Sequence, residues 1–191
     1  AVETSEMISH CLHGKSNYLV LGGDHSITAG IVKARSPVHL IMFDAHSDDY
    51  DDKHMSNYPL HHGNWLKYVT DKGLVTGITW YNYRKQKMES TLESRSIPKS
   101  GNVHISVDVD VLKPSEIAWA TPVPELGGCT LEKLVSDISS INTNNLDITA
   151  DIVEYDPTRD ASQAGGMAVS KIITALETVV NLSSIDALLH Q

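Results

Sequence analysis

Short runs of apolar, often β-branched residues alternate along this chain with longer amphipathic stretches. The runs typical of strands cover residues 18–21, 38–43, 74–80, 103–109 and 147–153. Apolar residues at helical spacing predict helices over residues 26–34, 63–72, 131–139 and 168–180. Such alternation is typical of βαβ units, and a continuous apolar run such as LIMF indicates a strand covered on both faces. We therefore predict an α/β fold of three layers, α/β/α, around a mostly parallel sheet.

Length and composition narrow the class of protein. The 191 residues, 41% hydrophobic and 20% charged, suit one globular domain over residues 1–191. No apolar run reaches the roughly 20 residues that cross a bilayer, and residues 1–18 lack the pattern of a signal peptide. A net charge of −9 argues against a nucleic-acid partner and is compatible with a cationic substrate. Cys11 and Cys129 have no metal-binding spacing and favour a reducing, cytoplasmic setting.

Polar clusters rich in acids and histidines follow three of the predicted strands. GGDHS follows the run at 18–21, DAHSD the run at 38–43, and EYDPTRD the run at 147–153. Open α/β sheets bind their ligands at the carboxyl ends of the strands. We therefore expect these three segments to deliver their side chains to one edge of the sheet.

The DAHSD segment offers three donors at alternating positions. In extended backbone, alternate side chains point the same way, so Asp44, His46 and Asp48 would face one point. A solvated polar loop is the alternative for this segment taken alone.

The SVDVD segment repeats that spacing with two acids. Asp108 and Asp110 would share one face, and neighbouring like charges are unfavourable unless a cation lies between them. A surface strand with solvated acids is the alternative, but VHISVDVDVL is too apolar for a fully exposed strand.

The GGDHS segment allows a tight turn from strand to helix. Capping of the following helix by Asp24 or Ser26 would explain these two residues without any function, but it does not explain His25. The three segments together offer six donors: His25, Asp44, His46, Asp48, Asp108 and Asp110. This oxygen-rich set favours Mn²⁺ over Zn²⁺, and six ligands suit two ions rather than one.

The ordered series GGDHS, DAHSD and SVDVD resembles the ureohydrolases, the arginase and agmatinase family. The resemblance continues in HHGN at 61–64, in ADIVEYDP at 150–157, at Asp160 and in the predicted helix that begins at residue 168. It covers about residues 18 to 182, without most of what the family has ahead of the GGDHS strand.

The resemblance implies two manganese ions and assigns their ligands. His25, Asp44, Asp48 and Asp108 would hold one ion. His46, Asp44, Asp108 and Asp110 would hold the other, so that Asp44 and Asp108 bridge the pair.

The resemblance also implies the catalytic roles. His62 would be the proton-shuttling histidine near the mouth of the site, and Glu154 would bind the substrate guanidinium. A guanidinium is a poor electrophile, so its hydrolysis needs a strong nucleophile such as a hydroxide held between two metal ions. Asp48 would pass a proton to the leaving amine, and the products would be urea and an amine.

Two features bear on the substrate. Tyr50 stands where arginases carry an asparagine that helps to read the substrate's α-carboxylate, and this favours an agmatinase-like enzyme. The segment 113–128, which borders the pocket in the family, departs from the family pattern. Agmatine or a similar guanidino compound is the first candidate, followed by arginine and then an N-formimidoyl compound. Homo-oligomers, trimers or hexamers, are implied by the resemblance.

Two alternatives remain at this level. His61 and His62 could be the paired histidines of the related zinc deacetylases, which use one ion and need neither His25 nor Asp110. A non-catalytic, metal-binding family member is the other, although all six donors and Glu154 are present. Among the remaining residues, we expect His104 to be a hydrogen-bonded core histidine, and Trp65 and Trp80 to be packing residues.

Overall fold

A parallel five-stranded sheet forms the centre of the protein, in the strand order β1-β5-β4-β2-β3. The computed structural model describes residues 1–51, 59–88, 90, 92–93 and 96–182. The strands are β1 (Leu19–Leu21), β2 (Val38–Phe43), β3 (Val75–Tyr81), β4 (Gly101–Asp108) and β5 (Leu146–Val153). Every neighbouring pair is parallel, which confirms the predicted fold class.

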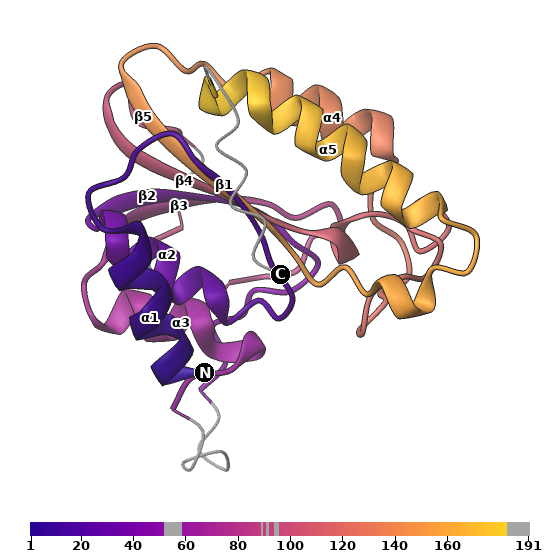
Figure 1. Cartoon of the computed structure of the whole chain (residues 1–191), viewed down its shortest axis with the longest axis horizontal. Coiled ribbons are helices and arrows are strands. Elements are labelled where there is room, and N and C mark those ends of the chain that lie inside the picture. The colour runs from indigo at the N-terminus through magenta and orange to yellow at the C-terminus, as the bar shows by residue number, and fades with distance from the viewer. Residues whose placement is uncertain (52–58, 89, 91, 94–95, 183–191) are drawn as a thin grey trace.

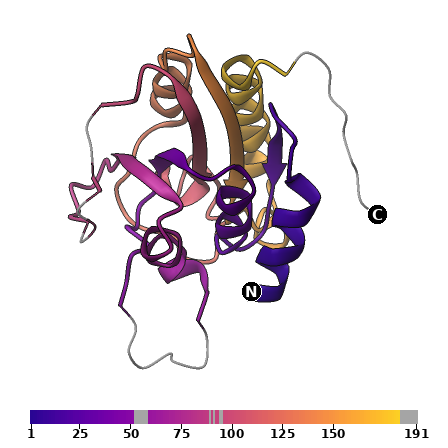
Figure 2. The same cartoon turned by 90° about the vertical axis from the view of Figure 1, so that its left-hand side faces the viewer.

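Helices cover both faces of this sheet, as Figure 1 shows from the side and Figure 2 from one end. One layer consists of α1 (Val2–Leu12), α2 (Ile27–Arg35) and α3 (Trp65–Asp71). The opposite layer consists of α4 (Leu131–Ser139) and α5 (Ala164–Val180). In the described loops there are three single turns of 3₁₀ helix: η1 (His62–Asn64), η2 (Val109–Val111) and η3 (Pro157–Arg159).

The sheet separates two hydrophobic clusters, and β2 contributes to both. All six residues of β2 are buried. Ile41 and Phe43 belong to the cluster beneath α4 and α5, whereas Leu40 and Met42 belong to the cluster beneath α2 and α3. Each such side chain stabilises the fold by roughly 1.5–3 kcal/mol relative to an exposed one. The continuous apolar run therefore forms a central strand covered on both faces, as predicted.

The boundaries of some elements differ from the sequence-based prediction. The helix α1 was not predicted, because its polar N-terminal sequence shows only a weak apolar stripe and its burial depends on α2. The helix predicted from residue 168 begins at Ala164, since Gly165 lets its first turn pack closely against the carbonyl of Ile117. Such a gain from tertiary packing is invisible to helix propensity.

The order of the strands places a topological switch between β2 and β4. From β2 the chain passes through α3 to the edge strand β3, whereas from β4 it passes through α4 to β5 on the other side. Ligands of open α/β sheets bind at the carboxyl ends of the strands where such crossovers diverge. The loops after β2 and β4 therefore form the centre of the expected site, with those after β1 and β5 beside them.

Within the described part of the chain, no helix combines the length and the apolar character that a bilayer crossing requires.

The packing of α1 on α2 gives a testable prediction at Gly30. A Cβ at this position would lie 2.5 Å from the backbone oxygen of Ser5. We expect Gly30→Ala to lower the free energy of unfolding in urea by about 1 kcal/mol or more, because overpacking outweighs the helix propensity gained. Ser170→Ala on the exposed side of α5 is the control and should change little. A stabilised Gly30→Ala protein would contradict the close contact of the two helices.

Candidate metal centre

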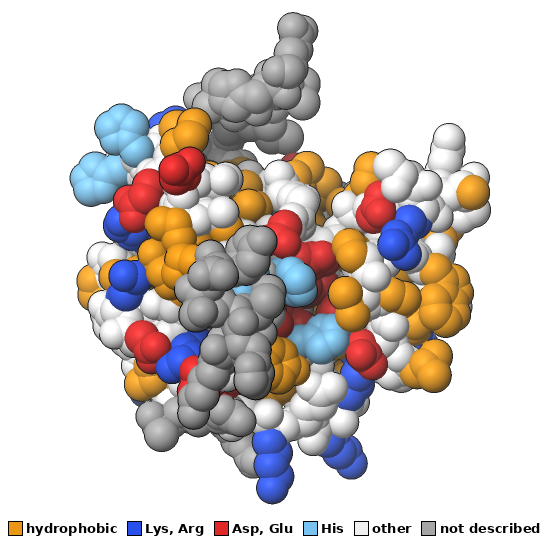
Figure 3. Space-filling model, turned by 90° about the horizontal axis from the view of Figure 1, so that it is seen from below, with side chains coloured by type: hydrophobic (Ala, Val, Ile, Leu, Met, Phe, Trp, Pro, Cys, Tyr) orange, Lys and Arg blue, Asp and Glu red, His pale blue; other side chains and the backbone are white. Residues whose placement is uncertain are grey.

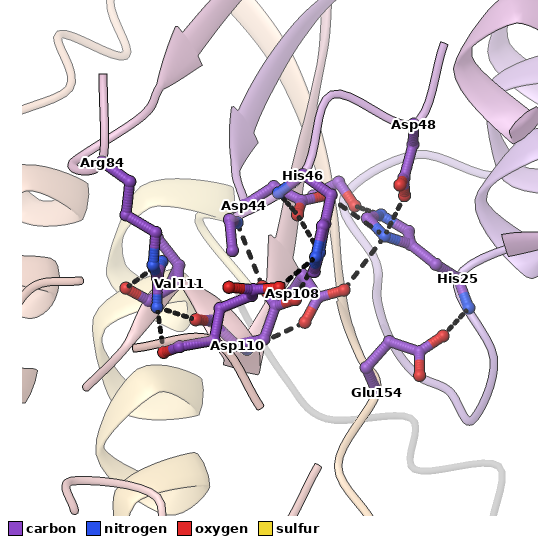
Figure 4. A network of polar contacts seen from close by, with 12 residues as sticks. His25, Asp44, His46, Asp48, Arg84, Asp108, Asp110, Val111 and Glu154 are labelled. Carbon is purple, nitrogen blue, oxygen red and sulfur yellow. Dashed lines mark hydrogen bonds and ion pairs between the residues drawn. The ribbon is translucent and has the colours of Figure 1, made fainter. Parts of the chain in front are cut away.

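Three loops at the carboxyl edge of the sheet bring the six predicted donors together. His25 lies in the turn between β1 and α2, and Asp44, His46 and Asp48 lie in the loop after β2. Asp108 ends β4, and Asp110 follows in η2. Figure 4 shows their side chains pointing toward one another, and Figure 3 shows acids and histidines gathered in a hollow of this face.

The first group of donors surrounds one ring nitrogen of His25. Its Nδ1 lies 3.1 Å from Asp48 Oδ2, 3.2 Å from Asp108 Oδ2 and 3.3 Å from Asp44 Oδ2. A single nitrogen cannot bind three carboxylates at once by hydrogen bonds. Convergence of this kind is instead what a shared cation requires.

The second group surrounds His46. Its Nδ1 lies 2.8 Å from Asp110 Oδ2 and 3.9 Å from Asp44 Oδ1. Asp44 therefore directs one carboxylate oxygen to each histidine. His25, Asp44 and Asp108 lie close enough to hold one ion, and Asp44, His46 and Asp110 lie close enough to hold another.

The electrostatics of the group also fit a metal. Asp44 and Asp108 are 1% and 3% exposed. Burial raises the pKa of Asp44 well above its ordinary value, and the charges of Asp48, Asp108 and Asp110 raise it further. Burial and the charge of Asp110 likewise raise the pKa of Asp108. Buried carboxylates this close are stable as anions only with positive charge between them, so the residues present suit divalent cations.

The same acids raise the pKa values of His25 and His46. Burial alone would lower the pKa of His25, but the carboxylates of Asp108 and Asp48 raise it well above its ordinary value. The contact with Asp110 raises the pKa of His46 to about 9. In addition, His25 Nδ1 and Asp44 Oδ2 are buried without a hydrogen-bond partner among the described residues. Unsatisfied donors and acceptors are costly to bury, and coordination of an ion would satisfy both.

The backbone achieves this convergence by turns rather than by the extended geometry that we predicted, and that part of the prediction is wrong. Asp48 has a φ of 49°, and Asp110 lies on a 3₁₀ turn after β4 has ended. The acids themselves stabilise these turns, because Asp44 Oδ1 accepts from the His46 N–H at 2.7 Å and Asp108 Oδ1 from the Asp110 N–H at 2.8 Å.

The turn that carries His25 is fixed from two sides. Asp24 Oδ1 accepts from the Ser26 N–H at 2.9 Å, which stabilises the turn ahead of α2. Ser26 is the N-cap residue of α2 but makes no side-chain capping bond, so Asp24 supports this turn and does not cap the helix itself. Glu154 Oε1 accepts from the His25 N–H at 2.7 Å, and the Glu154 N–H donates to the Gly23 carbonyl at 2.7 Å. Glu154 has a φ of 63°, which directs it from the end of β5 toward this turn.

Glu154 and His62 both line a cavity of about 300 Å³ above the two groups of donors. Burial raises the pKa of Glu154, although its bond from the His25 N–H opposes the shift. The His62 side chain is 58% exposed, and its Nδ1 lies 3.5 Å from Asp24 Oδ2. Both residues therefore border the space that a ligand of the six donors would occupy.

His61 has a defined structural role beside this cavity. Its Nδ1 accepts from the Gly63 N–H at 3.2 Å, and its backbone N–H donates to Asn64 Oδ1 at 2.8 Å. The two bonds cap η1, which agrees with the interpretation of His61 as a flanking residue. A deacetylase-like histidine pair is not favoured, because the donors form two groups and these include His25 and Asp110, which a one-ion site of that kind does not need.

The prediction that Trp65 and Trp80 only fill space was incomplete. Trp65 Nε1 donates to Asp48 Oδ2 at 2.8 Å, and its ring lies 4.7 Å from the ring of His25. Trp80 Nε1 donates to the carbonyl oxygen of Asp44 at 3.1 Å. No spacing in the sequence indicates these contacts, because each joins residues on different elements.

A buried polar network behind His25 was also missed. His25 Nε2 lies 2.9 Å from Ser106 Oγ, which donates to Asp151 Oδ1 at 2.7 Å. Asp151 Oδ2 accepts from Thr28 Oγ1 at 2.6 Å and lies 3.2 Å from His104 Nε2. Burial opposes ionisation of Asp151, but His104 lowers its pKa below the ordinary value. His104 is thus the hydrogen-bonded core histidine that was predicted, and polar residues at alternate positions of β4 and β5 were the signal for the network.

The segment 113–128 contributes to the cavity wall through Thr121 and Val123, in line with the expected position of this segment. A larger cavity of about 500 Å³ lies between Thr79, Pro98 and Asn142. Among the described residues that line this larger cavity there is no acid and no histidine, so they offer no comparable donors.

The raised pKa values predict how the metal-free protein responds to pH. A histidine with a folded-state pKa of about 9 and an unfolded pKa near 6.5 stabilises the fold below 6.5, and this contribution is lost as the pH rises toward 9. The raised pKa values of His25, Asp44 and Asp108 act in the same direction. We expect the Tm of metal-free protein to fall between pH 6.5 and 8.5, and the gain in Tm from added Mn²⁺ to grow over that range. His46→Asn should flatten the metal-free profile, whereas a wild-type Tm that rises with pH would contradict the assignment.

Comparison of the sequence with known proteins finds a family model and several relatives that match. The sequence model of the arginase family matches residues 2–91 and 74–177. The agmatinase of Blochmanniella floridana is 28% identical, over 86% of this chain and 61% of its own length. Arginase 2, chloroplastic/mitochondrial, of Arabidopsis thaliana is also 28% identical, over 83% of this chain and 53% of its own length. The chain thus spans about half to three fifths of the curated relatives it matches.

Solved structures agree on the fold. A hypothetical agmatinase from Burkholderia thailandensis superposes with a TM-score of 0.79 at 23% identity, covering 92% of this chain and 63% of its own. The formimidoylglutamase of Bacillus subtilis superposes with a TM-score of 0.73 at 19% identity, covering 96% of this chain and 68% of its own. With the family match over most of its length, this chain belongs to the arginase family.

Proposed function

We propose that this chain carries a dimanganese amidinohydrolase site that cleaves an agmatine-like guanidino compound to urea and an amine. The observation that carries the proposal is the convergence of two histidines and four aspartates beneath a cavity that Glu154 also lines. Membership of the arginase family supports this class of reaction. The sharing of Asp44 between the two groups of donors supports two ions rather than one.

Manganese suits this donor set because four carboxylates and two imidazoles form a hard, oxygen-rich environment without any thiolate. His25, Asp44, Asp48 and Asp108 would hold one ion, and His46, Asp44, Asp108 and Asp110 the other. When bound, the ions would supply an activated water as nucleophile at neutral pH.

Glu154 is the group proposed to hold the substrate. It lies at the end of β5 beside the His25 turn, and only Oε1 is used in its bond to the His25 N–H. Oε2 can therefore accept from a guanidinium, whose planar donors match a carboxylate. This contact would fix the guanidinium carbon close to the metal ligands.

Asp48 and His62 are proposed to move protons. Asp48 lies within the first group of donors, and Trp65 orients one of its carboxylate oxygens. It is therefore placed to accept a proton at the reacting centre and to donate it to the leaving amine. His62 is largely exposed at the mouth of the cavity, so it would exchange protons with solvent.

The cavity lining favours a substrate without a carboxylate. Among its described lining residues there is no lysine or arginine, and Asp24 lies beside His62 at the mouth. An amine at the far end of the substrate would be favoured beside Asp24, whereas a carboxylate would find no lysine or arginine among the described lining residues. Tyr50, which lines the cavity, is consistent with the same class of substrate.

The predicted trimer or hexamer and the predicted cytoplasmic location stay predictions, and light scattering of the purified protein would measure the first.

Removal of a shared donor should abolish the reaction. We expect Asp108→Ala to eliminate urea release and to reduce bound manganese below two ions per chain, because Asp108 would contact both. Metal content by atomic absorption and a colorimetric urea assay measure the two effects. Asp71→Ala, which removes an exposed acid paired with Lys67, is the matched control. Unchanged turnover in Asp108→Ala would refute the assignment.

Glu154→Gln separates substrate binding from metal binding. A glutamine oxygen still accepts from the His25 N–H, so the turn and the metal content should be preserved. Loss of the charge should lower kcat/KM for agmatine by about a hundredfold or more, equivalent to roughly 3 kcal/mol. Glu132→Gln on the exposed side of α4 is the control. If Glu154→Gln loses manganese instead, the proposed role of Glu154 is wrong.

A substrate panel tests the specificity. Agmatine, arginine, a guanidino acid and an N-formimidoyl amino acid would be compared at equal concentration with manganese-loaded protein. We expect the largest kcat/KM for agmatine, and preference for a carboxylate-bearing substrate would contradict the interpretation of the cavity lining. No turnover of any compound by protein that binds two ions would favour the non-catalytic alternative.

A further inference from the structure

We infer that Arg84 is a positioning residue that sets the geometry of Asp110 and therefore of the metal site around His46. The inference rests on the proposed two-ion centre. Arg84 follows β3 and contacts none of the six donors through their side chains, so nothing in its sequence context indicates this role.

The Arg84 guanidinium binds a cluster of backbone carbonyls. Nη2 donates to the oxygens of Asp110 at 2.8 Å, Glu125 at 2.8 Å and Leu112 at 3.3 Å. Nε donates to Leu126 at 3.0 Å and Nη1 to Val111 at 3.4 Å. Figure 4 shows the guanidinium against the Asp110–Val111 backbone. The planar fork of five donors thus joins two segments, the η2 turn and the loop around residue 125.

The η2 turn needs this support, since it has only three residues and few bonds of its own. The Asp110 carboxylate is bound on its far side, where Oδ1 accepts from the Ala45 N–H at 3.0 Å and Oδ2 contacts His46 Nδ1. Arg84 binds the backbone carbonyl of the same residue on the other side. Asp110 is therefore held between the loop after β2 and Arg84.

The loop around residue 125 contacts His46 at the other nitrogen of its ring, Nε2. Glu125 Oε1 lies 3.4 Å from His46 Nε2, and the carbonyl of Glu125 binds Arg84. Arg84 thereby positions the acids next to both ring nitrogens of His46. Among the described residues that the guanidinium contacts, neither His25 nor Asp44 is present, so the effect should fall on the donors around His46.

Gly128 shows how closely the loop packs around the guanidinium. A Cβ at Gly128 would lie 2.8 Å from Arg84 Nη2 and 2.5 Å from the Val111 oxygen, and its φ of 89° favours glycine. Next to Gly128, the Cys129 N–H donates to the Val111 carbonyl at 3.2 Å, and the Lys113 N–H donates to the Cys129 carbonyl at 2.9 Å. The carbonyl cluster is therefore a built contact between two segments rather than a chance surface interaction.

The test compares manganese binding by wild type, Arg84→Met and Arg84→Lys. Isothermal titration and equilibrium dialysis with atomic absorption would give the number and the affinity of bound ions. We expect two ions in wild type, and in Arg84→Met one ion of near wild-type affinity with the second bound about tenfold or more weakly. Arg84→Lys should lie between the two, because an ammonium has three donors and cannot span both segments.

Arg159→Met is the matched control, because Arg159 pairs with Asp156 on the exposed η3 turn. It should leave both sites unchanged. Equal weakening of both sites in Arg84→Met, with a parallel loss of metal-free Tm, would mean a general structural role and overturn the inference. Retention of both wild-type affinities would overturn it as well. If Arg84→Met does not fold, Arg84→Lys decides by the same criterion, with selective weakening of one site expected.

These measurements need no substrate, so they separate the inference from the proposed reaction. If wild type binds two ions but releases no urea, the proposed hydrolase function is rejected. The manganese affinities of wild type and the Arg84 variants still decide the role of Arg84 in that case. Wild type that binds fewer than two ions would overturn the inference itself.

Discussion

The repulsion among four aspartates at one edge of the sheet is the constraint on which the rest of this structure depends. Asp44, Asp48, Asp108 and Asp110 are all buried, and imidazole nitrogens are the nearest positive partners. Protons can balance this charge in part, as the raised pKa values indicate. Divalent ions would balance this charge more fully. Because the fold holds the four acids together, it favours the binding of metal.

The parallel sheet makes this concentration of charge possible. Its central strands end side by side, with Phe43 of β2 paired to Val107 of β4, so that Asp44 and Asp108 follow at the same level. Packing on both faces fixes the strands, and the loops then have little freedom to separate the acids. The fold places the site, while the loops decide which chemistry it performs.

Part of the site follows from local rules, and part does not. The strand ends and the six donors could be predicted, because apolar periodicity and strand termination depend on nearby residues. The alternating geometry proposed for Asp108 and Asp110 was wrong, because β4 ends at Asp108 and the acids cap their own turns. The contacts by which Trp65 and Asp151 support the site were not predicted, because each binds a residue on another element.

The sequence by itself determined the α/β class, the family and the identity of the residues that offer oxygen and nitrogen donors, since these depend on side-chain type and local pattern. Only the tertiary structure decided that Asp44 serves both histidines, that Glu154 holds the turn of His25, and that Arg84 binds the carbonyls behind Asp110. The physical reason is that backbone carbonyls and N–H groups are the same in every residue, so their partners are set by the arrangement of the chain in space and leave no pattern in the sequence.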